Sequence, residues 1–312
     1  MIAYLAFEGF EKQLQKDLKN ITASYNRLFL TDDVIQTPWA QNIWYNPVFI
    51  NISSIKDAAD TLKKIQRNWA YYPFKNHRRA HLIQDLLPYL SFKKINFYQK
   101  NPPNNLGSWT LVDNNTILAA SSCENPYANG EYIFNEDKQG PPSRAYLKLW
   151  EVFTRLQIIP NKTDLCIDLG ASPGSWTFVL DKLKTKIIAI DKAPLDNQFS
   201  NKSNIQYIKQ DAFTITPDKF PDAKWIFSDI ICFPEKLLNW LKEFFKKPNR
   251  PNFICTIKFK GTDDYSILEE FKKLPNSQII HLYNNKNELT WINLNTPDKC
   301  FQKDFQFLFQ EH

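Results

Sequence analysis

The stretch that decides the fold is DLGASPGSW, from Asp168 to Trp176. It follows a short apolar run and precedes a helix-forming run, so we expect a strand, a tight turn and a helix in succession. Gly170 and Gly174 are two of only seven glycines in the chain, and glycine lets the backbone approach a ligand closely. Neither G-x-G-x-x-G nor G-x-x-x-x-G-K-[ST] is present. Without a pyrophosphate to hold, such a loop suits an adenosine cofactor with an amino-acid tail.

Two acidic residues end the next two predicted strands. Asp191 closes KIIAID, 21 residues after Gly170, where a carboxylate can accept hydrogen bonds from ribose hydroxyls. Asp211 follows IQYIK, where a carboxylate could receive an adenine amino group. Either aspartate alone would be read as a strand-end turn or a helix N-cap. Because ligands of open α/β sheets bind at the carboxyl ends of strands, this order of residues predicts S-adenosylmethionine binding.

The surrounding half of the chain, residues 143–312, alternates apolar strands with helices. DLCIDLG, KIIAID, IQYIKQDA, AKWIFSDI and NFICTIKF are the predicted strands, which indicates a parallel sheet covered on both faces. QIIHLY and ELTWINL are separated only by NNKN, a link too short for a parallel crossover, so we expect an antiparallel hairpin. A mostly parallel sheet that ends in such a hairpin is typical of Rossmann-like methyltransferases. The predicted fold class is therefore α/β.

Residues 1–125 have a different, α+β pattern. IAYLAF, YNRLFL and KKINFYQ are predicted strands, and EKQLQKDLKNI, SIKDAADTLKKI and AHLIQDLLPYL are predicted helices. SWTLVDNNTILAASS predicts a hairpin that turns at Asp113-Asn114-Asn115. A polar stretch rich in turn formers follows, so we place a linker at 126–142 between this smaller domain and the α/β domain.

Composition limits the class of protein. The chain has 312 residues, of which 43% are hydrophobic, and a net charge of +6, which permits a nucleic-acid partner without demonstrating one. The five cysteines are widely spaced and form no C-x-x-C pair, so neither a disulfide framework nor a zinc knuckle is expected. No His/Cys or carboxylate cluster suggests a metal. With no visible signal peptide and no apolar run of about 20 residues, we expect a cytoplasmic protein without a membrane partner.

Five blocks, in order, resemble the FtsJ-like ribose 2′-O-methyltransferases: SRAYLKLWE, DLGASPGSWT, FSDI, IKFKG and NELTWINL. Within that family the chain is most similar to the cytidine 2′-O-methyltransferases of bacterial large-subunit ribosomal RNA, whose THUMP-type RNA-binding part residues 1–125 could represent. The resemblance implies an RNA substrate, most simply large-subunit ribosomal RNA. SDIICFP stands where Ser-Asp-Met-Ala-Pro is more usual in the family. The cofactor residues predicted from the spacing and the resemblance together are Asp168, Gly170, Ala171, Ser172, Pro173, Gly174, Trp176, Asp191, Asp211, Ala212 and Asp229.

The family uses a Lys-Asp-Lys-Glu tetrad, and the resemblance places it on Lys148, Asp229, Lys258 and Glu288. A lysine can take the proton of a ribose hydroxyl only if its pKa falls toward neutrality, which a second ammonium group and partial burial would favour. The residues alone leave alternatives. Lys258 and Lys260 share one strand face, Lys148 could pair with Glu151 on the surface of its helix, and Glu288 could be exposed in its hairpin.

Three further interpretations remain open. Cys232 and Cys255 lie where a base C5-methyltransferase could carry its nucleophile, although Cys255 falls within a predicted strand. A non-catalytic RNA-binding or assembly factor could retain a methyltransferase fold. The stretch 66–81 interleaves basic residues with Trp69, Tyr71, Tyr72 and Phe74, which suits either RNA contact or a small core. Its candidate RNA-binding residues are Arg67, Lys75, Arg78 and Arg79.

Overall fold

The computed structural model describes residues 1–295 except 92, 104 and 260–263. The chain forms two compact units. The first contains Met1–Ile95 and Lys100–Ile133, and the second contains Asn96–Gln99 and the chain from Phe134 onward. The predicted linker, 126–142, is thus divided between the two units at Ile133.

The second unit contains a seven-stranded sheet, which confirms the predicted α/β class. Its order is β12-β11-β10-β13-β14-β16-β15. The first five of these strands pair in parallel, and β16 is antiparallel to both β14 and β15, as the short NNKN link predicts. The strands are β10 (Leu165–Leu169), β11 (Lys186–Asp191), β12 (Ile205–Lys209), β13 (Ala223–Ser228), β14 (Asn252–Lys258), β15 (Ser277–Ile280) and β16 (Glu288–Asn293).

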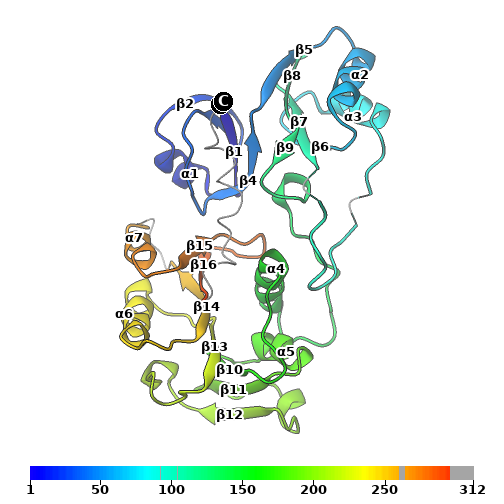
Figure 1. The fold of residues 1–312 in the computed structure, drawn as a ribbon. Helices are drawn as coiled ribbons and strands as arrows, with labels where there is room; N and C mark the ends of the chain where they lie inside the picture. The colour runs from blue at the N-terminus through cyan, green and yellow to red at the C-terminus, as the bar shows by residue number, and fades with distance from the viewer. Residues whose placement is uncertain (92, 104, 260–263, 296–312) are drawn as a thin grey trace. The chain divides into compact units, whose positions relative to one another are not determined.

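Helices cover both faces of this sheet. α4 (Tyr146–Leu156) and α5 (Ser175–Lys182) lie on one side, and α6 (Pro234–Phe245) and α7 (Ile267–Lys272) lie on the other (Figure 1). From β10 the chain moves outward through β11 and β12, then returns to place β13 on the opposite flank of β10. The carboxyl ends of β10 and β13 therefore meet at a topological switch point, where open α/β sheets bind their ligands.

Aromatic packing ties α4 to the centre of the sheet. The Phe153 ring of α4 lies edge-on to Phe227 of β13, with ring centroids 6.1 Å apart, and Phe227 stacks on Trp225 at 5.7 Å. The same helix buries two charged residues, Lys148 and Glu151. Their burial means that α4 supplies more than an apolar face.

The first unit contains two sheets. A five-stranded sheet has the order β2-β3-β1-β4-β9, and a four-stranded sheet has the order β5-β8-β7-β6. β7 and β8 form the hairpin predicted around Asp113-Asn114-Asn115. The strands are β1 (Ile2–Ala6), β2 (Ile21–Tyr25), β3 (Leu28–Thr31), β4 (Ala40–Tyr45), β5 (Val48–Asn51), β6 (Trp69–Tyr71), β7 (Gly107–Leu111), β8 (Thr116–Ala120) and β9 (Ser122–Cys123), and the helices are α1 (Glu11–Asp17), α2 (Ile55–Ile65) and α3 (His77–Leu86).

Two predicted strands of this half are wrong. YNRLFL is not one strand, because Tyr25 ends β2 and Asn26 has φ 56°, the left-handed conformation of a hairpin turn. KKINFYQ forms no strand. Its apolar residues instead anchor the segment to the second unit, where the Phe97 ring stacks on Trp150 at 5.0 Å and the Tyr98 hydroxyl donates to the Gln157 carbonyl.

Candidate active site

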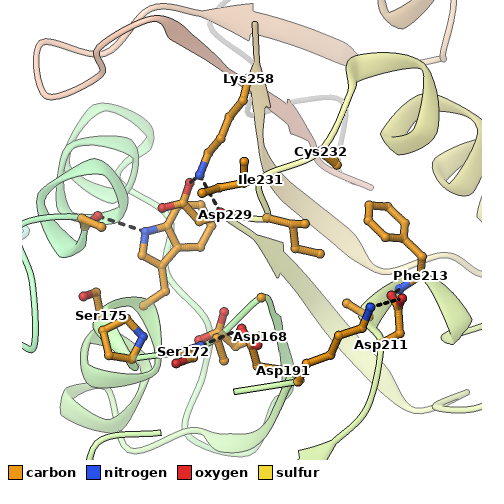
Figure 2. A pocket seen from close by; sticks show the side chains of 18 of the residues that line it. Asp168, Ser172, Ser175, Asp191, Asp211, Phe213, Asp229, Ile231, Cys232 and Lys258 are labelled. Atoms are coloured by element: carbon orange, nitrogen blue, oxygen red, sulfur yellow. Dashed lines mark hydrogen bonds and ion pairs between the residues drawn. The ribbon is translucent and has the colours of Figure 1, made fainter. Parts of the chain in front are cut away.

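A cavity of about 640 Å³ lies at the carboxyl ends of the parallel strands (Figure 2). Every predicted cofactor residue except Gly174 lines it. Of the predicted tetrad, Asp229 and Lys258 line it directly. The sequence did not single out several other lining residues: Ser143, Ala145, Lys192, Gln210, Phe213, Ile230, Ile231, Phe233 and Lys236.

The two glycines of the loop are required by close approach. Gly170 has φ +71°, and a Cβ built on it would lie 2.4 Å from Cγ1 of Ile230. Gly174 has φ +117° and caps α5, and a Cβ there would lie 2.3 Å from the Phe199 ring. Both positions combine a left-handed backbone with a contact that excludes any side chain. Gly170 therefore allows the loop to pack against Ile230, and Gly174 allows it to pack against Phe199.

Backbone amide groups hold Asp191 at the end of β11. Its Oδ2 accepts a hydrogen bond from the Ser172 amide at 3.0 Å, and its Oδ1 accepts one from the Ala193 amide at 2.9 Å. The carboxylate thus fastens the glycine loop to the end of the strand. Each carboxylate oxygen has further acceptor capacity toward the cavity.

Asp211 is held by a lysine that the sequence did not indicate. Nζ of Lys192 lies 2.7 Å from Oδ2 of Asp211, and the Phe213 amide donates a hydrogen bond to Oδ1 of Asp211 at 3.0 Å. These two hydrogen bonds hold the pKa of Asp211 below its ordinary value. A ligand amino group that binds Asp211 would share this carboxylate with Lys192.

Asp168 is buried beneath the loop, with 1% of its surface exposed. The Thr177 hydroxyl donates to its Oδ2 at 2.6 Å. Burial raises the pKa of Asp168 from 3.8 to about 7, and the negative charges of Asp229 and Asp191 act in the same direction, while the Thr177 hydrogen bonds oppose the rise. Asp168 therefore exchanges its proton near neutral pH.

The four residues of the predicted tetrad come together at the other end of the cavity. Lys148 Nζ of α4 lies 2.6 Å from Oδ2 of Asp229 and 3.0 Å from Oε1 of Glu288. Lys258 Nζ lies 2.8 Å from Oδ1 of Asp229, donates to the Asp229 carbonyl at 2.6 Å, and lies 3.9 Å from Oε2 of Glu288. We call these four residues the lysine–carboxylate cluster.

The pairing of neighbouring strands explains why three residues of this cluster lie close together. Lys258 and Glu288 are direct partners in the antiparallel pair of β14 and β16, so their side chains leave the sheet on the same face. Asp229 follows β13, the parallel neighbour of β14, and its Oδ1 also accepts a hydrogen bond from the Thr256 hydroxyl at 2.7 Å. Three adjacent strands thus deliver three of the charges, and α4 supplies the fourth.

The electrostatics of Asp229 follow from its lysine neighbours. Burial by itself would raise the pKa of this carboxyl group. The adjacent ammonium groups of Lys148 and Lys258, with their hydrogen bonds, outweigh that effect and hold the pKa of Asp229 below its ordinary value. Asp229 therefore stays charged throughout the neutral pH range.

The surface alternatives for Lys148 and Glu288 are wrong. The side chains of Lys148 and Glu288 are 7% and 14% exposed, so neither is a solvated surface residue. Glu151 pairs with Arg155 at 2.6 Å rather than with Lys148. Lys260, the alternative to Lys258, lies outside the described residues.

Glu151 forms a network that the sequence did not predict. Its Oε1 accepts from the Tyr283 amide at 2.8 Å, and its Oε2 accepts from the amide and the side chain of Asn284 at 3.1 and 3.0 Å. The carboxylate is fully buried. It therefore fixes the connection between β15 and β16, which leads directly to Glu288, against the helix that carries Lys148.

The thiol groups differ in their access to the cavity. Cys255 is fully buried in β14, and burial raises the pKa of its thiol, so it is unsuited to act as a nucleophile. Cys232 lines the cavity after Asp229. Cys300 lies outside the described residues. Among the residues that the structure describes, no group of three or more His, Cys, Asp or Glu side chains could hold a metal ion.

The basic stretch of the first unit is partly a core segment. Trp69 and Tyr72 are buried, so they do not offer stacking surfaces for bases. Phe74 is partly exposed, and Lys75 Nζ lies 5.1 Å from the centre of its ring. Of the four candidate RNA-binding residues, Arg67, Lys75 and Arg78 are exposed and Arg79 is half-buried.

No helix among the described residues has both the length and the apolar character required to cross a bilayer.

Part of the chain is similar to known methyltransferases. Residues 141–281 match the model of the FtsJ-like methyltransferase family. Ribosomal RNA large subunit methyltransferase M of Tolumonas auensis is 30% identical over 41% of this chain and 36% of its own length. The protein of the same name from Marinomonas sp. is 29% identical over 48% of this chain and 47% of its own length. The similarity thus spans less than half the length of these relatives. Residues 141–281 are thus similar to FtsJ-like methyltransferases.

Proposed function

We propose that this chain is an S-adenosylmethionine-dependent RNA methyltransferase that modifies a ribose 2′-hydroxyl of large-subunit ribosomal RNA. The observation that carries the proposal is the lysine–carboxylate cluster at one end of the cavity. The relatives named ribosomal RNA large subunit methyltransferase M support the choice of RNA as substrate.

The acidic end of the cavity fits the cofactor. Asp191 ends β11 and Asp211 follows the neighbouring parallel strand β12, and both line the cavity, as ribose hydroxyls and an adenine amino group require. Gly170 lets the loop approach Ile230 closely, because a Cβ on Gly170 would lie 2.4 Å from Cγ1 of Ile230. The cofactor supplies an activated methyl group.

Proton removal falls to Lys258. This role requires the neutral amine form of Lys258, because an ammonium group has no lone pair to accept a proton. The proton of the acceptor hydroxyl would then pass to Nζ of Lys258 as the oxygen takes the methyl group that S-adenosylmethionine would supply, with a neutral thioether as the leaving group. Asp229 holds Nζ through its carbonyl and Oδ1, which fixes the direction of the amine. Lys148 shares the Asp229 carboxylate and adds positive charge near the developing alkoxide, and Glu288 orients both lysines.

The test is methyl transfer from labelled S-adenosylmethionine to unmodified ribosomal RNA, with the product mapped by mass spectrometry. Lys258→Ala is expected to reduce the rate by about 10²- to 10⁴-fold while the affinity for the cofactor is retained. Lys224→Ala is the matched control, because Lys224 is an exposed lysine on β13 of the same sheet. Full activity of Lys258→Ala would overturn the assignment of the base.

The same assay separates the rival functions. A non-catalytic assembly factor would bind the cofactor and RNA but label no RNA. A base C5-methyltransferase that uses Cys232 would place the methyl group on the base, lose activity in Cys232→Ala and keep it in Lys258→Ala. A methyl group on a ribose 2′-oxygen would exclude both rivals.

RNA contact outside the cavity is proposed for Arg67, Lys75, Arg78 and Arg79. Exposed arginines and lysines neutralise phosphates, so their removal should weaken RNA binding and reduce its dependence on salt. The THUMP-like role of residues 1–125 rests on this contact. The proposal for this surface is independent of the chemistry at Lys258.

A further inference from the structure

The loop between β13 and α6 exposes two large apolar side chains. Ile231 is 66% exposed and Phe233 is 64% exposed. Among the described residues from Phe134 onward, Tyr283 is the only other exposed large hydrophobic residue, and its exposed fraction is lower, at 38%. Exposed apolar groups that gather at a cavity indicate a binding surface rather than a part of the core.

Local packing does not account for this exposure. The helix that follows buries Leu237, Leu238 and Leu241 against the sheet, so the loop leads into an ordinary apolar face. Ile231 and Phe233 instead line the cavity. Two apolar side chains of this size in water are unfavourable unless a ligand covers them.

The loop borders the lysine end of the cavity. Figure 2 shows Ile231 beside Asp229 and Lys258, whereas Asp191 and Asp211 lie at the opposite side. Phe233 comes two residues later on the same loop and lines the same cavity. A group that covers Ile231 is therefore a neighbour of whatever reacts at Lys258.

We infer that Ile231 and Phe233 form an apolar ledge for the base of the acceptor nucleotide, and that this nucleotide is unpaired. The inference rests on the proposed function. The 2′-carbon of a ribose is bonded to the carbon that bears the base, so a hydroxyl at Lys258 brings its base within one sugar's width of the cluster. Ile231 is the exposed apolar side chain that lies there.

An unpaired nucleotide follows from the chemistry of the ledge. Side chains such as isoleucine and phenylalanine contact the flat face of a base. In a duplex both faces are covered by neighbouring base pairs, although the 2′-hydroxyl remains exposed in the shallow groove. A site that needed only the hydroxyl would have no use for apolar side chains at this position.

The test uses a large-subunit ribosomal RNA fragment that the wild type methylates at a mapped nucleotide. The double variant Ile231→Ala/Phe233→Ala is expected to raise the KM for this RNA about tenfold or more. The dissociation constant for S-adenosylmethionine, measured without RNA, should change less than about twofold. Ile231→Val/Phe233→Tyr keeps the apolar surface and the ring, and should retain a KM near that of the wild type.

A second arm tests pairing. Annealing the fragment to a complementary strand across the target nucleotide should slow wild-type methylation at least about tenfold. Equal rates on free and annealed RNA would overturn the unpaired acceptor. An unchanged KM in the double alanine variant would overturn the ledge, and so would an equal loss of cofactor affinity, because the loop would then contact the cofactor.

The experiment distinguishes a failure of the proposed function from a failure of the apolar ledge. If the wild type labels no ribosomal RNA at all, the proposed function fails. If the wild type labels RNA and the alanine variant behaves identically, only the ledge is wrong. Circular dichroism and the midpoint of thermal unfolding of each variant show that a loss of activity is not a loss of folding.

Discussion

Asp168 and Asp229 occupy similar positions in the sheet, but their pKa values are shifted in opposite directions. Each lies at the carboxyl end of one of two neighbouring parallel strands, and both line one cavity. Asp168 accepts a hydrogen bond from the Thr177 hydroxyl, and burial raises its pKa to about 7. Asp229 lies against two ammonium groups, which outweigh burial and lower its pKa. Burial raises the pKa of both carboxyl groups, and only beside Asp229 do two ammonium groups reverse this effect.

This difference divides the cavity into two chemical halves. The cluster of Lys148, Lys258, Asp229 and Glu288 has formal charges that cancel, so it can hold a lysine near a reacting hydroxyl without a large net field. The opposite half carries Asp168, Asp191 and Asp211, and of these Asp211 is paired with Lys192. Substitutions at the carboxylates therefore test each half separately.

The largest expected effect comes from Asp229→Asn. Removal of this charge leaves two partly buried ammonium groups with Glu288 alone, and we expect the free energy of unfolding to fall by about 3 kcal/mol, with loss of methyl transfer. Urea denaturation at pH 7 measures the change. Asp218→Asn is the control, because Asp218 pairs with Lys247 at 2.8 Å on the surface and should matter by at most about 1 kcal/mol. Similar losses in both variants would contradict the role of the cluster.

Glu151→Gln tests a third buried carboxylate, whose role is to hold the backbone. Like Asp229, Glu151 faces a cation, but it also accepts two backbone amides from the connection between β15 and β16. Loss of the charge weakens these hydrogen bonds, so we expect a loss of about 2 kcal/mol and faster hydrogen exchange of the Tyr283 and Asn284 amides.

The control for Glu151 is Glu243→Gln. Glu243 pairs with Lys246 on an exposed face of α6, and its loss should cost at most about 0.5 kcal/mol. If exchange at Tyr283 and Asn284 stays slow in Glu151→Gln, the carboxylate does not hold the connection. A methyl-transfer assay of the same variant then reports whether the position of Glu288 depends on it.

Two kinds of feature could be predicted from the sequence: regular patterns of apolar residues, and structures formed by residues close together in the chain. Alternation of apolar strands and helices predicted the parallel sheet, and the short NNKN link predicted its antiparallel end. The order of Asp168, Asp191 and Asp211 predicted one edge of the sheet, since carboxyl ends of parallel strands meet there. The members of the tetrad came from a family resemblance, because spacing alone did not choose between Lys258 and Lys260.

Contacts between distant residues could not be predicted in this way. Glu151 meets the amides of Tyr283 and Asn284 across more than 130 positions, and a helical pattern does not reveal that a glutamate is fully buried. Phe97 and Tyr98 looked like strand residues because their apolar character is real, but it serves packing on α4. Tertiary contacts decided both cases.

At pH 7 the smallest expected effect is that of Asp168, which appears mainly as a dependence of stability on pH. Its pKa in the folded chain, about 7, lies above the ordinary value of 3.8, so between these values the folded state binds more protons than the unfolded state. The stabilising contribution is therefore complete below about pH 4 and is lost as the pH rises through 7. Relative to Asp168→Asn, the free energy of unfolding of the wild type should fall over this window, by at most about 1.4 kcal/mol per pH unit.

Urea denaturation of wild type, Asp168→Asn and Asp229→Asn from pH 5 to pH 8 measures that slope. The Asp229 pKa is lowered, so its stabilisation is complete above the ordinary value and is lost only as the pH falls through the lower folded value. The difference between wild type and Asp229→Asn should thus stay constant over the range in which the difference between wild type and Asp168→Asn declines. A flat difference for Asp168→Asn would mean that this carboxylate is charged at every pH tested, and that burial does not raise its pKa into this range.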